Sequence, residues 1–284
     1  VGDLLYVLAD YESEIRLLAV DAADGAVKWT QHLAVVERDV ARDPVRQTAG
    51  VSPSHADGVL VCPTASGAVV AVDAATQSLR WGYRYARDAA TQRSQSVREG
   101  ISNRGRRGGS SGGGWFGAGV MIAEGLALVA PADANDLFAL DLDDGSLAWR
   151  CSREDGLFLA GCVDGRLLIV GADTLRFLDV RSGEPIDIRE KGGAGGIHVG
   201  GRGKNAIVLE DLGMPCGRGY TSDGRYFLPL RSGNVVTVDF ATGSVVGLSR
   251  PRQHSRPGNL ICYEGSVLSQ DAARLECFYQ LESL

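Results

Sequence analysis

One short pattern recurs along the chain and limits its fold more than any other feature. An apolar segment ends in Ala-x-Asp, a glycine follows four residues after the aspartate, and a tryptophan follows eight residues after it. Three copies keep the tryptophan, although the second has Gln77 in place of the glycine, and two later copies keep only the aspartate and the glycine. The matching positions are Asp21, Gly25 and Trp29; Asp73 and Trp81; Asp141, Gly145 and Trp149; Asp179 and Gly183; and Asp239 and Gly243.

Each copy is typical of a strand, a tight turn and a second strand. The residues before the aspartate, such as 69–72, are β-branched or aliphatic, which favours a short buried strand. An aspartate at the strand end can accept hydrogen bonds from main-chain N–H groups one or two residues later, and glycine adopts a positive φ at low cost. The pattern therefore predicts a repeated hairpin rather than a catalytic motif.

The spacing of the copies predicts the architecture. Successive aspartates lie roughly 40 to 70 residues apart, and a repeat of about 40 residues with four short strands is typical of a β-propeller blade. The 38 glycines and 44% apolar residues suit short strands joined by tight turns. We predict an all-β β-propeller of four-stranded antiparallel blades, with about six repeats in the 284 residues.

Strand positions can be predicted in the two best-formed repeats. In the second repeat we expect strands at residues 50–54, 59–63, 68–73 and 79–85. In the third repeat we expect the inner strand to begin at Trp115 and Phe116 and to continue through residues 120–122. The other strands of the third repeat are expected at residues 126–131, 137–141 and 147–151.

The Ala-x-Asp-x-x-x-Gly-x-x-x-Trp pattern resembles the tryptophan-docking motif of the pyrroloquinoline-quinone-like propeller repeats. This family includes quinoprotein dehydrogenases, the outer-membrane-protein assembly lipoproteins and the propeller regions of large bacterial multidomain proteins. The resemblance implies that Trp29, Trp81 and Trp149 pack between neighbouring blades. It also implies a bacterial protein of the periplasm or cell envelope.

We expect residues 1–284 to form a single β-propeller domain or a segment of one. The first repeat has no residues for an inner strand and the last has none for an outer strand, so the two cannot complete each other. We therefore expect a parent ring of about seven or eight blades. The remaining blades would come from the same parent chain or from another subunit.

Two segments interrupt the repeats. Residues 86–114 are basic and rich in Gly, Ser and Arg, which predicts an inserted flexible loop. Residues 191–204 form a second, glycine-rich insertion. Its glycines do not follow a strand and open a helix, as a phosphate-binding loop requires, so we expect a connector there.

Charge and composition limit the partners. The formal net charge is -6, which gives no general attraction to nucleic acid, and we expect no nucleic-acid partner. No apolar run approaches the roughly 20 residues of a membrane-spanning helix. We expect a protein partner or further propeller blades.

Cysteine, histidine and aspartate do not form a metal or redox motif. The six cysteines include no Cys-x-x-Cys and are expected as small buried residues, although a disulfide between Cys151 and Cys162 stays open. The repeated aspartates are expected to cap turns rather than to bind calcium. We therefore expect no metal site, no cofactor and no catalytic residue. No two histidines have a spacing that would place two metal ligands on one strand or helix. The histidines are His32, His55, His198 and His254.

Enzymatic alternatives remain. Family resemblance implies an adjacent Cys-Cys pair in the quinone-dependent dehydrogenases, and the sequence has no such pair. A dehydrogenase using pyrroloquinoline quinone and calcium would need a divergent site. A carbohydrate-active propeller would need two carboxylates close together, drawn from residues such as Asp133, Asp136 or Asp223.

The most specific candidate for a partner contact combines basic and aromatic residues. Three arginines precede two aromatic residues, a combination that can bind an acidic surface. The alternative is a solvated loop whose aromatic residues enter the next blade. The most favoured function is a noncatalytic scaffold for protein–protein or cell-envelope assembly contacts. The candidate contact residues are Arg104, Arg106, Arg107, Trp115 and Phe116.

Overall fold

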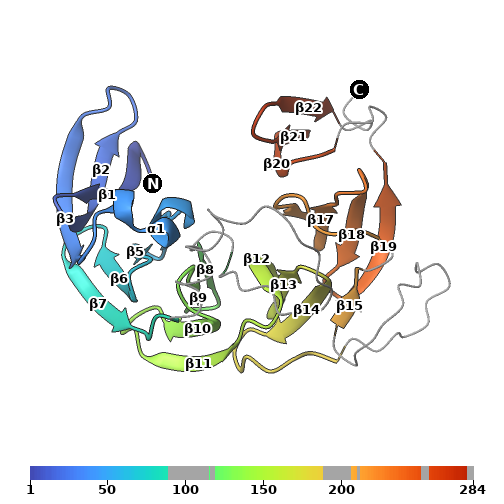
Figure 1. Cartoon of the computed structure of the whole chain (residues 1–284), viewed down its shortest axis with the longest axis horizontal. Coiled ribbons are helices and arrows are strands. Elements are labelled where there is room, and N and C mark those ends of the chain that lie inside the picture. Colours follow the sequence, from blue (N-terminus) through green and yellow to red (C-terminus); the bar gives the residue numbers. More distant parts are fainter. Residues whose placement is uncertain (89–114, 116–118, 188–205, 210–211, 251–255, 280–284) are drawn as a thin grey trace. The chain divides into compact units, whose positions relative to one another are not determined.

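The computed structural model describes residues 1–88, 115, 119–187, 206–209, 212–250 and 256–279. Nearly all regular structure is β, arranged in six antiparallel sheets (Figure 1). The chain divides into two compact units, residues 1–154 and 155–284, and each contains three sheets. The all-β prediction, with four-stranded antiparallel sheets of a β-propeller, is confirmed.

Residues 1–154 form sheets β1–β3, β4–β7 and β8–β11, in which each strand pairs with the next along the chain. The strands are β1 (Leu4–Tyr11), β2 (Glu14–Asp21), β3 (Val27–Val35), β4 (Ser54–Ala56), β5 (Val59–Pro63), β6 (Ala68–Asp73), β7 (Leu79–Arg84), β8 (Gly119–Ala123), β9 (Leu126–Ala130), β10 (Asp136–Asp141) and β11 (Leu147–Ser152).

Residues 155–284 form sheets β12–β15, β16–β19 and β20–β22 in the same way. The strands are β12 (Gly156–Val163), β13 (Arg166–Gly171), β14 (Thr174–Asp179), β15 (Ala206–Val208), β16 (Tyr220–Ser222), β17 (Arg225–Pro229), β18 (Val235–Asp239), β19 (Ser244–Ser249), β20 (Asn259–Tyr263), β21 (Ser266–Gln270) and β22 (Leu275–Tyr279).

The first two strands of five sheets are joined by the same two-residue turn. In sheet β4–β7 this turn is Asp57-Gly58, where φ is +49° and +76°. Two consecutive positive φ values match the tight hairpin turn whose twist suits antiparallel strands. An acidic residue followed by glycine occupies the same place at residues 124–125, 164–165, 223–224 and 264–265.

Two predicted inner strands were misplaced. The second repeat begins at β4, residues 54–56, rather than at 50–54, because the Asp57-Gly58 turn fixes which residues pair with β5. The third repeat begins at Gly119, and Trp115 lies outside any strand. The remaining strands of these two repeats agree with prediction to within one residue.

Sheet β4–β7 buries one face against sheet β1–β3 and the other against sheet β8–β11. Leu60 and Cys62 of β5 pack with Ile15 and Leu17 of β2, while Val61, also on β5, faces the sheet β8–β11. This alternation follows from the two-residue period of a strand. Sheet β4–β7 is therefore covered on both faces.

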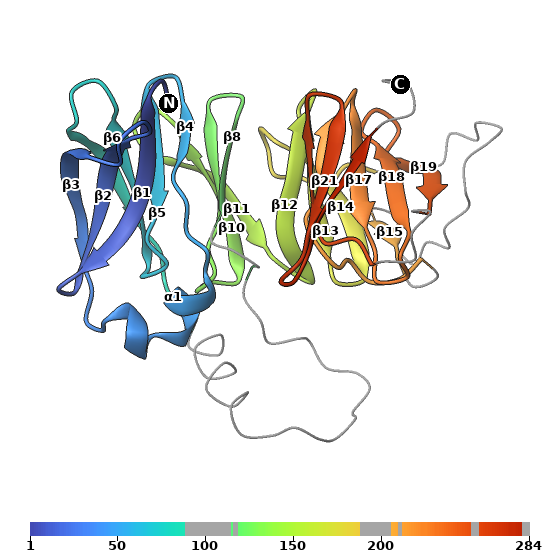
Figure 2. The same ribbon diagram turned by 90° about the horizontal axis from the view of Figure 1, so that it is seen from above.

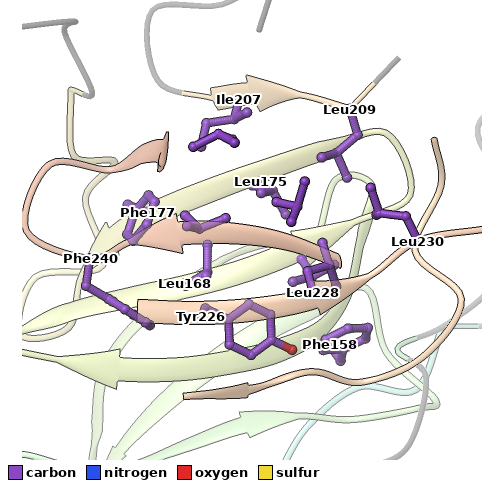
Figure 3. Close-up of a cluster of buried hydrophobic side chains, with 14 residues drawn as sticks. Phe158, Leu168, Leu175, Phe177, Ile207, Leu209, Tyr226, Leu228, Leu230 and Phe240 are labelled. Atoms are coloured by element: carbon purple, nitrogen blue, oxygen red, sulfur yellow. The ribbon is translucent and has the colours of Figure 1, made fainter. Parts of the chain in front are cut away.

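The second unit has its main core between sheets β12–β15 and β16–β19 (Figure 3). Phe177 and Phe240 meet edge to face, with ring centroids 5.7 Å apart. The buried Tyr226 hydroxyl accepts a hydrogen bond from the Gly219 N–H at 2.8 Å. Burial and this bond keep the polar end of an otherwise apolar core residue satisfied.

A short helical segment follows β3. It contains the 3-10 helix η1 (Val40–Arg42) and the α-helix α1 (Pro44–Thr48), which begins at the capping residue Asp43. Both lie at one end of the strands of the first unit (Figure 2). None of the helices in the described ranges has the length and hydropathy needed to cross a bilayer.

Candidate functional site

The five aspartates of the repeated pattern all end a strand and organise the following turn. In each copy the N–H of the residue four positions later donates to the aspartate carbonyl, as Gly145 does to Asp141 at 3.0 Å. The carboxylates also accept main-chain N–H groups two or three residues on, for example Thr76 to Asp73 at 2.8 Å. The Thr76 N–H lowers the pKa of the Asp73 carboxyl. The positions are Asp21, Asp73, Asp141, Asp179 and Asp239.

Trp81 lies against the turn at residues 141–145 of the next sheet. Its indole N–H donates to the Leu142 carbonyl at 2.9 Å. A Cβ placed on Gly145, where φ is +73°, would stand 2.6 Å from the Trp81 ring. The ring therefore occupies the space that any side chain at position 145 would need.

The other two pattern tryptophans differ in exposure. Trp149 on β11 is buried, whereas Trp29 on β3 is partly exposed. Trp29 lies near Tyr6, with ring centroids 5.7 Å apart, and packs against the apolar cluster shared by sheets β1–β3 and β4–β7. That these tryptophans hold neighbouring sheets in register stays a proposal.

Most of the candidate partner contact lies outside the described residues, namely Arg104, Arg106, Arg107 and Phe116. The glycine-rich insertion at 191–204 also lies outside them. Trp115 is described and is 3% exposed. Its indole N–H donates to the Asp136 carbonyl at 3.2 Å. The Trp115 ring is therefore a buried anchor and not an exposed aromatic.

The candidate carboxylate Asp133 is fully buried in a polar network. Its carboxylate accepts a hydrogen bond from the Tyr85 hydroxyl at 2.7 Å and pairs with Arg87 Nε at 3.0 Å. Arg87 also pairs with Asp43 at 3.3 Å. Burial raises the pKa of Tyr85 well above its ordinary value, and the Asp133 charge raises it further. A carboxylate held in this way is not open to a sugar, and sequence spacing gave no signal for the network.

The two other carboxylates proposed for carbohydrate chemistry are not among the residues of this network. Asp136 starts strand β10, and Asp223 lies in the turn between β16 and β17. Across the described ranges, no group of three or more His, Cys, Asp or Glu side chains could hold a metal ion. His198 and His254 lie outside those ranges. The six cysteines are free thiols, and burial raises the pKa of Cys62 to about 12.

Within residues 1–154, one face of sheet β1–β3 is apolar and is not covered by another sheet. The pairing registers make Leu5 on β1 equivalent to Leu60 on β5 and Ala127 on β9. Leu60 is 1% exposed and Ala127 is buried, but Leu5 is 56% exposed. Val7, two residues later on the same face, is likewise exposed. In the next two sheets the equivalent face is covered by the preceding sheet.

The turn beside this face is also uncovered. Gly25 has the same φ as Gly145 to within a degree, and its N–H makes the same hydrogen bond to the preceding aspartate carbonyl. A Cβ on Gly25 would meet no atom within 4 Å, whereas one on Gly145 would meet Trp81. Apolar periodicity alone predicts that this sheet has a buried face and does not show whether another sheet covers it.

Comparisons with solved structures show the same fold. BamB from Moraxella catarrhalis superposes with a TM-score of 0.54 at 16% identity, covering 97% of this chain and 75% of the BamB chain. A quinohemoprotein alcohol dehydrogenase from Pseudomonas putida superposes with a TM-score of 0.51 at 14% identity. That match covers 88% of this chain but only 41% of the dehydrogenase.

Sequence comparison identifies the family. A search of curated proteins found no match. The family model described as outer membrane protein assembly factor BamB matches residues 1–109 and 93–259, which is most of the chain. The chain therefore belongs to the BamB family of pyrroloquinoline-quinone-like β-propeller repeats.

Proposed function

We propose that this chain is a noncatalytic β-propeller scaffold that makes protein–protein contacts in the assembly of a bacterial cell envelope. The family match supports an assembly role and a location in the periplasm or at the outer membrane. The observation that carries the proposal is the apolar face of sheet β1–β3 at Leu5 and Val7, which no other sheet of residues 1–154 covers. Large exposed apolar faces on soluble proteins are typical of interaction sites.

The occupant of that face would be a further sheet or protein surface. In the next two sheets, equivalent residues are buried by a neighbouring blade, so the face has the right side chains for such packing. Burying Leu5 and Val7 would stabilise the contact by about 1.5 to 3 kcal/mol for each side chain. The partner is either further blades of the same parent chain or another subunit.

The test removes the apolar face in the organism that encodes the protein. The variant carrying Leu5→Glu and Val7→Glu should fail to restore outer-membrane protein levels in a deletion strain, as measured by quantitative proteomics of the envelope. Leu79→Glu is the matched control, because Leu79 is also exposed but lies on β7. An envelope proteome unchanged by the deletion itself would contradict the assembly role.

The second candidate is a dehydrogenase that uses pyrroloquinoline quinone and calcium. Only the fold of the Pseudomonas putida enzyme favours it. Calorimetric titration of the protein with the quinone in the presence of calcium tests this candidate directly. Saturable one-to-one binding would support the dehydrogenase and argue against a purely structural role.

A further inference from the structure

A groove runs between β3 and β7, the last strands of the first two sheets. One hollow of about 460 Å³ is lined by residues of β3, β6 and β7, including Val35 and Gly82, and by Gly67 in the turn before β6. A second hollow of about 360 Å³ is lined by the segment after β3, by α1 and by the end of β7. The two hollows share Val35, Ser66 and Arg84. They therefore adjoin, at the end of the strands where α1 lies (Figure 2).

Gly82, which has no side chain, lines the first hollow. Gly82 pairs with Val70 across strands β6 and β7, and Val70 belongs to the cluster that packs against sheet β1–β3. A Cβ on Gly82 would meet no atom within 4 Å. The residue before it, Trp81, faces sheet β8–β11. The gap left by Gly82 therefore opens on the side of β3.

The wall of the groove is apolar at its centre. Val35, which is 73% exposed, lines both hollows. Leu33 on β3 and Val70 on β6 line the first hollow and belong to the same apolar cluster. An exposed valine beside an unfilled apolar hollow provides a place for one apolar side chain of a partner.

The second hollow is rich in arginine. Arg46 pairs with the carboxylate of Asp10, and Arg87 pairs with two carboxylates, those of Asp43 and Asp133, so neither guanidinium group is free to bind a partner.

The other two arginines of the hollow are Arg38 and Arg84, both exposed. Within the described residues neither of them forms an ion pair, and only Glu37 remains as an unpaired carboxylate in the lining. At the rim of the second hollow, two exposed arginines therefore stand against one exposed carboxylate.

We propose that this groove binds an extended acidic peptide segment, with one apolar side chain in the hollow at Gly82 and carboxylates at Arg38 and Arg84. The inference rests on the proposed scaffold function, since it names the kind of partner that the scaffold contacts. Arginine suits the task because its planar guanidinium can bind a carboxylate through two parallel hydrogen bonds. Apolar anchoring beside charged recognition is a common way to bind an extended peptide.

Fluorescence anisotropy tests the proposal with a labelled peptide of about ten residues. In this peptide, three apolar residues, each valine or leucine, precede three acidic residues. We expect saturable binding that weakens as salt is added. Arg84→Gln should weaken binding by about tenfold, because it removes a charge-assisted hydrogen bond. Arg42→Gln, which changes an exposed arginine of η1 outside the groove, should leave binding unchanged.

A second pair of variants tests the apolar end. Gly82→Leu fills the hollow and should weaken binding by about tenfold or more. Gly119→Leu is the control, because Gly119 also lies in a strand where a Cβ would meet no atom within 4 Å, and it does not line the groove. Thermal unfolding of both variants establishes that each is folded.

Several outcomes would overturn the proposal: no saturable binding, equal binding by a peptide with lysines in place of its acids, equal effects of Gly82→Leu and Gly119→Leu, or complete competition by inorganic phosphate at equal concentration. These outcomes are separable from a failure of the scaffold function. If the peptide does not bind while envelope composition still depends on the gene, the groove inference fails alone. If the peptide binds and envelope composition does not change, the assembly role fails.

Discussion

Two junctions between neighbouring sheets contain the same pattern with a different residue four positions after the aspartate. The first is the junction between sheets β4–β7 and β8–β11, and the second is the junction between sheets β1–β3 and β4–β7. At the first junction this residue is Gly145, and the 9% exposed Trp81 ring lies directly on it. At the second junction it is Gln77, whose φ is +60°, and Trp29 stays partly exposed.

The difference shows what glycine contributes at this position. A positive φ alone is not decisive, because Gln77 also adopts one and its N–H makes the same hydrogen bond to Asp73 at 2.8 Å. The absence of a Cβ is what allows the Trp81 ring to approach the turn at residues 141–145. We infer that the residue at this position sets how closely a tryptophan can pack on the next sheet.

The largest expected effect is that of Trp81→Ala. Truncating this buried aromatic side chain should lower the free energy of unfolding by about 3 to 5 kcal/mol. The change also leaves the Leu142 carbonyl without its indole donor. Chemical denaturation followed by circular dichroism measures the loss. Trp29→Ala should cost less, since that ring is partly exposed, and equal costs at the two positions would contradict the comparison.

Gly145→Ala should come next. Alanine would be held at a positive φ, and its Cβ would stand against the Trp81 ring, for a combined cost of about 2 to 4 kcal/mol. Gly25→Ala is the matched control because it has the same φ and an open surrounding, and it should cost about 1 to 2 kcal/mol. The same denaturation experiment compares the two variants. Indistinguishable costs would mean that the contact with Trp81 adds nothing.

Gln77→Gly should have the smallest effect on stability, and in the opposite direction. Glycine removes the strain of a non-glycine residue at positive φ, at the expense of greater freedom in the unfolded chain. We expect a net gain of about 0.5 to 1 kcal/mol, read as a higher denaturation midpoint. A loss of stability would indicate that the Gln77 side chain itself supports the junction.

The aspartate turns should also make stability depend on acid. In the folded protein, the Thr76 N–H lowers the pKa of the Asp73 carboxyl, and the Ser182 N–H lowers the pKa of the Asp179 carboxyl. Their contribution is present above the unfolded pKa of about 4 and is lost as the pH falls through the lower folded value. Asp73→Asn should therefore flatten the decrease of the unfolding midpoint between about pH 5 and pH 3. An unchanged acid slope would argue against this cause.

Much of the fold could be predicted from local sequence signals. The strands β5 and β6 were predicted at their observed residues, because apolar β-branched runs end there at Pro63 and Asp73. The aromatic pair at 115–116 predicts an earlier start for β8 than Gly119, because it does not reflect that the Glu124-Gly125 turn fixes which residues pair with β9. That acidic–glycine turn recurs in five sheets, so it was an available signal.

The sites depend on contacts between residues far apart in sequence. The groove at Gly82 requires a glycine on β7 to face β3, and the buried network at Asp133 joins residues from three segments. The open face of sheet β1–β3 has the same apolar alternation as the covered faces of its neighbours. Local pattern predicts that such residues are suited to burial, whereas only the three-dimensional arrangement shows which of them are covered.

A double-mutant cycle of Trp81→Ala and Gly145→Ala tests most directly whether the contact between Trp81 and the turn at residues 141–145 joins sheets β4–β7 and β8–β11. The free energy of unfolding is measured for the original protein, the two single variants and the double variant. We predict that Gly145→Ala costs only about 1 to 2 kcal/mol once Trp81 is removed, as Gly25→Ala does, which gives a coupling energy of about 1 to 3 kcal/mol. Strictly additive costs would contradict the account.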